Sequence, residues 1–152
     1  MLEQIRALFS GDAKKPAVAK PADLQIAVGA LLVEAALRND EFDPAERTTI
    51  ERLLAARFHL SAAAAHALVK ECEGIIADSH QLFGFIRQVM KEMSEEARIK
   101  LIEMLWEVAY ADGALDLHED ALIRKVAGLI YVTDFDRGAA RRRVREKLGL
   151  GA

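Results

Sequence analysis

The sequence feature that most constrains the fold is a short acidic pattern that occurs twice, 73 residues apart. In each copy an acid precedes an apolar run, and a glutamate follows three positions later. The two pairs are Asp43 with Glu46 and Asp116 with Glu119. This spacing is typical of a capping box, in which both residues satisfy backbone amides at a helix start. Three more pairs keep the offset: Glu34 with Glu107, Ala36 with Ala109, and Ile50 with Ile123. The repeat predicts two related helical halves.

The composition favours helices over sheets. The chain has 152 residues, enough for one domain with a core, and 52% of them are apolar. Aromatic residues are only 6%, and alanine is frequent, which suits closely packed helices better than a β-sandwich. No segment alternates between apolar and polar residues as a half-buried strand does. We therefore expect an all-α, single-domain helical bundle with an internal duplication.

Apolar residues recur at helical spacing in seven segments after residue 21, and we expect one folded domain over residues 22–148. The predicted caps are Asp43, Ser61, Ser94, Asp116 and either Thr133 or Asp134, and Asp78 with Gln81 gives a further capping-box spacing. The predicted helix ends lie at Asn39 or Asp40, near Ile76, at Asp112 with Gly113, and at Gly149.

The N-terminal segment differs from this domain. Residues 1–9 predict a short amphipathic helix, and residues 10–21, rich in Pro, Gly and Lys, predict a linker. The short helix is expected to pack on its own domain, with peripheral contact at the inner membrane or a partner protein as the alternative. The chain lacks a secretory signal and a bilayer-length apolar run, and Cys72 is its only cysteine. These features predict a cytoplasmic protein.

The two acidic turns are candidate sites for a divalent cation. Carboxylate oxygens are ligands for Ca²⁺ or Mg²⁺, although the spacing is not that of an EF-hand. The candidates are Asp112, Asp116 and Glu119 in the second turn and Asp40, Asp43 and Glu46 in the first. Helix capping alone explains most of these acids and is the favoured interpretation. His118 lies in the second turn as a further candidate ligand, and the other histidines are scattered.

Other polar residues have simpler interpretations. Glu34 and Glu107 stand in apolar stretches, and we expect them to be solvated or ion-paired, with the lining of a groove as the alternative. Cys72 is expected in the core. The last helix is rich in cations, and Arg141, Arg142 and Arg145 are candidates for binding nucleic acid or anionic lipid. A solvated face is favoured, because no stacking aromatics accompany these arginines.

The segments EAALRNDEFDPAERTTIERLL and EVAYADGALDLHEDALIRKVAGLIYV, read together, resemble the tellurite-resistance TerB family and the N-terminal domain of DjlA-type membrane co-chaperones. The resemblance covers about residues 24–148. The first segment departs from the pattern, with Asn39 and Asp40 where the second has Asp112 and Gly113. The resemblance implies a non-enzymatic domain linked to tellurite and stress responses, whose acidic clusters bind divalent cations or partner proteins.

We therefore expect a TerB-like binding or scaffold domain with a protein partner. One alternative is a metal-dependent enzyme that uses Asp112, Asp116 and Glu119, although no base or nucleophile is placed beside them. The other is a binder of nucleic acid or anionic membrane through the arginine-rich last helix. No Walker motif, Gly-rich phosphate loop or serine elbow is present.

Overall fold

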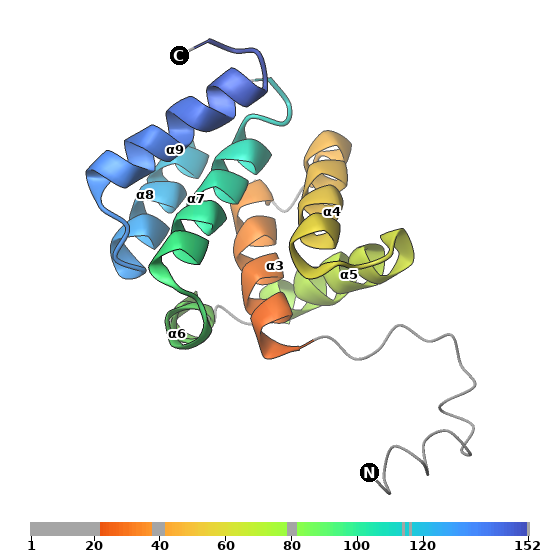
Figure 1. Cartoon of the computed structure of the whole chain (residues 1–152). Coiled ribbons are helices and arrows are strands. Elements are labelled where there is room, and N and C mark those ends of the chain that lie inside the picture. Colours follow the sequence, from red (N-terminus) through yellow and green to blue (C-terminus); the bar gives the residue numbers. More distant parts are fainter. Residues whose placement is uncertain (1–21, 38–41, 79–81, 114, 116, 152) are drawn as a thin grey trace, which may run out of the picture.

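The computed structural model describes residues 22–37, 42–78, 82–113, 115 and 117–151. These residues form helices and no strand, which confirms the all-α class (Figure 1). The helices are α3 (Asp23–Ala36), α4 (Pro44–Phe58), α5 (Ala62–Asp78), α6 (Leu82–Glu92), α7 (Glu95–Ala109), α8 (Leu117–Leu129) and α9 (Asp134–Lys147). The predicted N-terminal helix and linker, residues 1–21, lie outside the described residues.

The helix bounds reproduce the repeat. α3 ends at Ala36 and α7 at Ala109, and α4 begins at Pro44 and α8 at Leu117, so both pairs of bounds are 73 residues apart. The two copies therefore fall on the helix pairs α3–α4 and α7–α8. Two predicted ends were wrong: α3 stops at Ala36 and not at Asn39 or Asp40, and α7 stops at Ala109 and not at Asp112 and Gly113.

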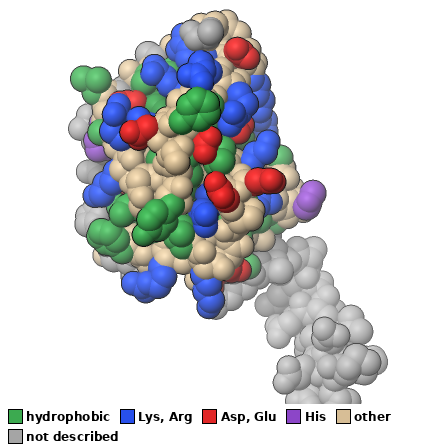
Figure 2. All heavy atoms as spheres, turned by 60° about the vertical axis from the view of Figure 1, so that its left-hand side comes forward, with side chains coloured by type: hydrophobic (Ala, Val, Ile, Leu, Met, Phe, Trp, Pro, Cys, Tyr) green, Lys and Arg blue, Asp and Glu red, His purple; other side chains and the backbone are tan. Residues whose placement is uncertain are grey.

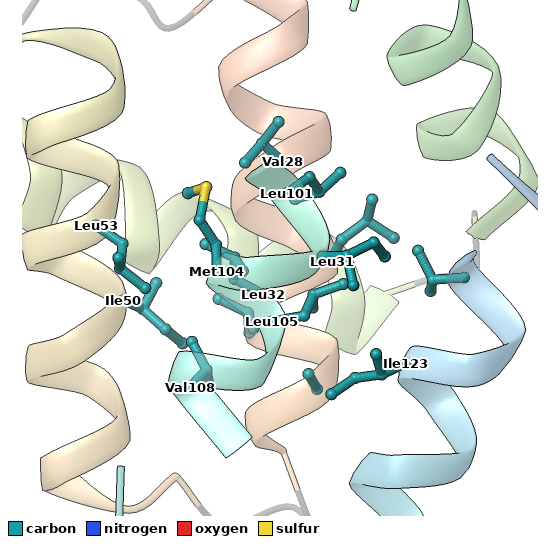
Figure 3. Close-up of a cluster of buried hydrophobic side chains, with 14 of the residues drawn as sticks. Val28, Leu31, Leu32, Ile50, Leu53, Leu101, Met104, Leu105, Val108 and Ile123 are labelled. Carbon is teal, nitrogen blue, oxygen red and sulfur yellow. The ribbon is translucent and has the colours of Figure 1, made fainter. Parts of the chain in front are cut away.

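The core is organised around α3, which contacts α4, α5, α6, α7 and α8. Leu31 and Leu32 of α3 lie against Leu101 and Leu105 of α7, and Ile123 of α8 faces the same cluster (Figure 3).

α3 also approaches α5 closely. A side chain at Gly29 would place its Cβ 2.7 Å from the Cys72 sulfur, so only glycine fits here without adjustment.

Four predicted caps are confirmed. The side chains of Asp43, Ser61, Ser94 and Thr133 accept hydrogen bonds from backbone amides in the first turns of α4, α5, α7 and α9. Pro44 takes the first position of α4, where an amide is not needed. Asp116 and Gln81 lie outside the described residues. Asp78 is the last residue of α5, which runs two residues beyond Ile76, so its predicted role as a cap was wrong.

The C-terminal glycine of α9 is also confirmed. Gly149 has a left-handed φ of 74°, and its amide donates to the Glu146 carbonyl at 3.1 Å. The Leu150 amide donates to the Arg145 carbonyl at 2.8 Å. Together these bonds form a Schellman motif that satisfies the last carbonyls of the helix. Within the described part of the chain, no helix is both long and apolar enough to span a bilayer.

Candidate functional site

Two predicted ligands lie at the start of α4. Asp43 is the N-cap, and its Oδ1 accepts a hydrogen bond from the Ala45 amide at 2.7 Å. Glu46 lies in the first turn of α4, where its side chain turns inward and is only 1% exposed. A carboxylate at a helix N-terminus is stabilised by the helix dipole, which offsets part of the cost of burying Glu46.

The third ligand comes from the other half of the chain. Asp112 is exposed and follows the end of α7. The chain turns here because the Gly113 amide donates to the Tyr110 carbonyl at 3.0 Å and Gly113 adopts a φ of 90°. A left-handed φ of this kind favours glycine, as predicted for this position. The turn thus holds the Asp112 side chain just beyond the last turn of α7.

The two acidic turns meet at one place. Asp43, Glu46 and Asp112 each offer a carboxylate oxygen, and these three oxygens lie within 4.8 Å of one another. We call these three residues the acidic cluster. Oxygen ligands sit about 2.0–2.6 Å from Mg²⁺ or Ca²⁺, so one ion can contact oxygens separated in this way. The sequence predicted these residues as candidate ligands in two separate turns. Packing of α4 against α7 brings the two turns together.

The remaining predicted ligands are not members of this cluster or lie outside the described residues. Glu119 is fully buried in the first turn of α8 and is not part of the acidic cluster. Asp40 and Asp116 lie outside the described residues. His118 is exposed at the start of α8 and does not join the cluster either.

The family model for tellurite resistance protein TerB matches residues 25–142, a range that contains the whole acidic cluster. The chain belongs to the TerB family. Neither the comparison with curated proteins nor the comparison with solved structures gives a match. The match ends within α9, so Arg145 lies beyond the part of this TerB-family protein that the family model covers.

Glu107 forms a second polar centre in the TerB domain. It is only 4% exposed, and its carboxylate pairs with Arg52 of α4 and with Lys147 of α9, the latter at 2.9 Å. Burial raises the pKa of Glu107, but hydrogen bonds from the two cations outweigh burial and hold the pKa below its usual value. The prediction of an ion-paired glutamate is confirmed. Its repeat partner Glu34 is half-buried on α3.

Glu107 also helps to line a hollow of about 440 Å³ between α4, α7 and α9. Residues such as Leu53, Met104 and Lys100 line the same hollow.

Cys72 is a core residue, as predicted. Burial, with smaller contributions from Glu71 and Glu73, raises the pKa of its thiol to about 12.

The histidines show no metal-site geometry among the described residues. His66 Nδ1 lies 2.8 Å from a carboxylate oxygen of Glu51, and both are on the surface side of α4 and α5. His59 is exposed at the end of α4 in a left-handed conformation, with a φ of 56°. His80 lies outside the described residues. The acidic cluster is therefore the only group of three possible metal ligands in the described part of the chain.

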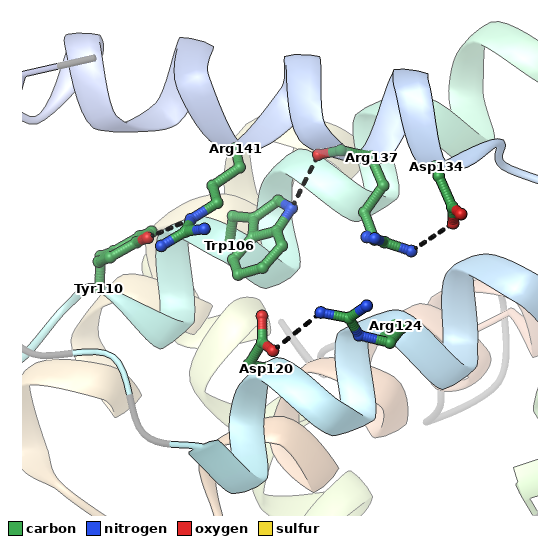
Figure 4. Close-up of polar contacts among 7 residues, drawn as sticks. All are labelled: Trp106, Tyr110, Asp120, Arg124, Asp134, Arg137 and Arg141. Carbon is green, nitrogen blue, oxygen red and sulfur yellow. Dashed lines mark hydrogen bonds and ion pairs between the residues drawn. The ribbon is translucent and has the colours of Figure 1, made fainter.

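The arginines of α9 are arranged differently from the prediction. Aromatic residues do accompany them: the Arg141 guanidinium lies over the rings of Trp106 and Tyr110, both of α7 (Figure 4). Arg141, Arg142 and Arg145 line one hollow of about 400 Å³. Figure 2 shows a face on which Lys and Arg side chains alternate with acidic ones, without a broad basic patch.

Proposed function

We propose that this TerB-family protein is a non-enzymatic binding module whose two acidic turns together hold one divalent cation. The observation that supports it is the convergence of Asp43, Glu46 and Asp112, contributed by both copies of the repeat, within 4.8 Å. Like charges at this separation repel one another, and a divalent ion between them replaces the repulsion with attraction.

The burial of the three ligands supports a site that is open on one side. Glu46 is buried, Asp43 is half-buried and Asp112 is exposed. A cation held here would face solvent beside Asp112, where water or a carboxylate from a partner protein completes the coordination. We propose such a protein as the partner and a scaffold role in a tellurite-type stress response, with the protein located in the cytoplasm.

A cation bound in this way would also join the two halves of the domain. Asp43 and Glu46 belong to the α3–α4 pair, and Asp112 follows α7 of the α7–α8 pair. Binding therefore stabilises the folded state by an amount that rises with ion concentration, as for any ligand that binds only the folded chain. A metal-dependent enzyme has less support, because the acidic cluster includes no histidine, serine or lysine as a base or nucleophile.

The test is a calcium titration of the isotope-labelled full chain, followed by amide NMR and repeated with magnesium. We expect saturable shifts at residues 42–47 and 110–119. Asp112→Asn and Asp43→Asn should each weaken binding about tenfold, in line with the loss of one charged ligand. Asn is as good an N-cap as Asp, so Asp43→Asn removes charge while it retains the cap.

The control is Asp134→Asn, an exposed acid in the first turn of α9 whose loss should leave calcium binding unchanged. Shifts spread over all surface acids, or equal binding by Asp112→Asn and the wild type, would exclude a site at the acidic cluster. The domain would then be a scaffold whose acidic turns serve as helix caps.

A further inference from the structure

The cations of α9 fall into two classes. Three of them pair with carboxylates: Arg137 with Asp134 at 2.7 Å, Arg143 with Glu103 at 2.9 Å, and Lys147 with Glu107 at 2.9 Å. The other three, Arg141, Arg142 and Arg145, form no ion pair with any described carboxylate. These unpaired arginines are also the ones that line the hollow on α9.

Neutral groups hold two of the three in place. Arg141 Nε donates to the Tyr110 hydroxyl at 2.6 Å, and its guanidinium lies 5.4 Å from the centroid of the Trp106 ring. Arg145 donates through Nε and Nη2 to the carbonyls of Gly151 and Leu150, at 3.2 and 2.9 Å. It also lies over the Tyr110 ring at 5.3 Å. These contacts fix the guanidinium groups without pairing them to a described carboxylate.

The hollow itself follows from the sequence of α9. Gly138, Arg141, Arg142 and Arg145 have the spacing that places residues on one face of a helix. Gly138 leaves space because it has no side chain, and Arg142 reaches back over it, with Nη1 3.8 Å from the position that a Cβ would take. The result is a hollow of about 400 Å³ lined by this glycine and the three arginines.

We propose that this hollow binds a phosphate monoester group. A guanidinium carries five N–H donors, and charge-assisted hydrogen bonds from such donors bind phosphate oxygens strongly. Arg141 uses one donor for Tyr110, and Arg145 uses two for Gly151 and Leu150, so all three arginines keep Nη donors for a phosphate. A phosphate monoester carries about −1.5 to −2 charges at neutral pH, and the three arginines that line the hollow have no described carboxylate partner. The volume lies near the lower end of the range for small-molecule sites, about 300–1,000 Å³, which suits a phosphate and a short ester group.

A nucleic-acid surface fits these residues less well. Single-stranded nucleic acid is held by a basic groove together with aromatic rings on which bases stack. Trp106 and Tyr110 are 2% and 5% exposed, and arginines already cover them. Their rings therefore orient Arg141 and Arg145 and are not accessible to a base. The proposed site differs in residues and in charge from the acidic cluster.

The test is an amide NMR titration of the full chain with inorganic phosphate and with glycerol 3-phosphate, with ionic strength held constant by sodium chloride. We expect saturable shifts centred on residues 138–145. Arg142→Gln should weaken binding about tenfold, and this side chain is exposed, so the fold is retained. Gly138→Leu fills the hollow without a change in charge and should weaken binding at least tenfold.

Two matched variants separate the site from general charge effects. Arg143→Gln removes the same charge from the same helix, outside the hollow, and should bind as the wild type does, within twofold. Gly138→Ala adds a Cβ that meets only an ordinary contact at 3.8 Å, and it should retain binding. Equal weakening by Arg143→Gln and Arg142→Gln, or full binding by Gly138→Leu, would overturn the proposal, as would the absence of saturable shifts.

Vesicles identify the source of the phosphate. Sedimentation with phosphatidylcholine vesicles that contain phosphatidic acid is compared with pure phosphatidylcholine. Co-sedimentation that requires phosphatidic acid and is lost in Arg142→Gln assigns a lipid headgroup. Binding of glycerol 3-phosphate without co-sedimentation assigns a soluble phosphate ester, and both results support the site.

Discussion

Helices α3 and α9 both pack on α7, but different forces hold them there. α3 buries Leu31, Leu32 and most of the residues around them at the centre of the domain. α9 buries only Ala140 and Val144. It is fixed by polar contacts to α7, among them the Trp106 indole N–H, which donates to the Arg137 carbonyl at 3.3 Å.

This difference separates the parts of the chain that determine the fold from those available for binding. Truncation of a buried apolar side chain removes its burial and leaves a cavity in the core. The buried face of α3 therefore tolerates few substitutions. Polar contacts at a surface contribute little each, so α9 can carry charges that are not needed for stability. The arginines that line the hollow belong to this second group.

The largest effect is expected for Leu32→Ala in α3. Leu32 is fully buried, and its truncation should lower the free energy of unfolding by about 2–5 kcal/mol through lost burial and a residual cavity. Urea denaturation measures this. Leu117→Ala is the control, since that side chain is 87% exposed and should shift stability by about 0.5 kcal/mol or less. Similar losses in both variants would contradict the central role of α3.

The second prediction concerns the contact between α3 and α5. Gly29→Ala places a Cβ 2.7 Å from the Cys72 sulfur, so it should destabilise the domain by about 1–3 kcal/mol despite the better helix propensity of alanine. In a Cys72→Ala background the remaining contacts, at 3.6 Å and beyond, are ordinary. The same substitution should then be neutral or stabilising. A double-mutant cycle with no coupling would disprove the clash.

The features of the fold that the sequence predicted correctly depend on residues close together in the chain. A cap lies next to the amides that it satisfies, so Asp43, Ser61, Ser94 and Thr133 were recognised from neighbouring residues alone. The 73-residue offset was equally visible, and it matches the end of the first helix and the start of the second helix in each half. The end of α3 was misplaced because it was judged from Asn39 as a cap, whereas the helix stops three residues earlier.

The candidate sites show where this kind of inference stops. Helical periodicity gives the face on which a residue lies but not the neighbour that it meets. Arg52 and Lys147 pair with Glu107 across 55 and 40 residues, and Trp106 and Tyr110 contact α9 residues 31 positions away. For the same reason the three members of the acidic cluster were predicted as candidate ligands of two separate turns and not as one group. Comparison of the two repeat copies was the one signal in the sequence that could have predicted that the two acidic turns form a single group.

The third prediction tests the buried ion pairs that tie α9 and α4 to Glu107. Glu107→Gln should lower stability at pH 7 by about 1–2 kcal/mol, a modest loss because Arg52 and Lys147 are largely exposed. The folded-state pKa of Glu107 lies below its usual value. Its stabilisation is therefore fully present above the ordinary glutamate pKa and is lost as the pH falls through the lowered one.

Urea denaturation of both proteins between pH 7 and pH 3 measures this dependence. The difference between wild type and Glu107→Gln should stay constant down to about pH 5 and then shrink, because a protonated glutamate resembles glutamine. Glu92→Gln, at an exposed position on α6, is the control and should show no such trend. A difference that grows on acidification would mean that Glu107 is protonated in the folded state.

The smallest effect is expected for Arg143→Gln in α9. The pair between Arg143 and Glu103 is partly exposed, and exposed pairs contribute about 0.2–1 kcal/mol, which salt screens further. The variant should lose no more than this at low ionic strength and less in 0.5 M sodium chloride. Thermal denaturation at both salt concentrations measures it. A salt-independent loss of stability above about 2 kcal/mol would show that the packing of α9 depends on this pair. Helices α3 and α9 would then both be essential to the fold and would differ only in degree.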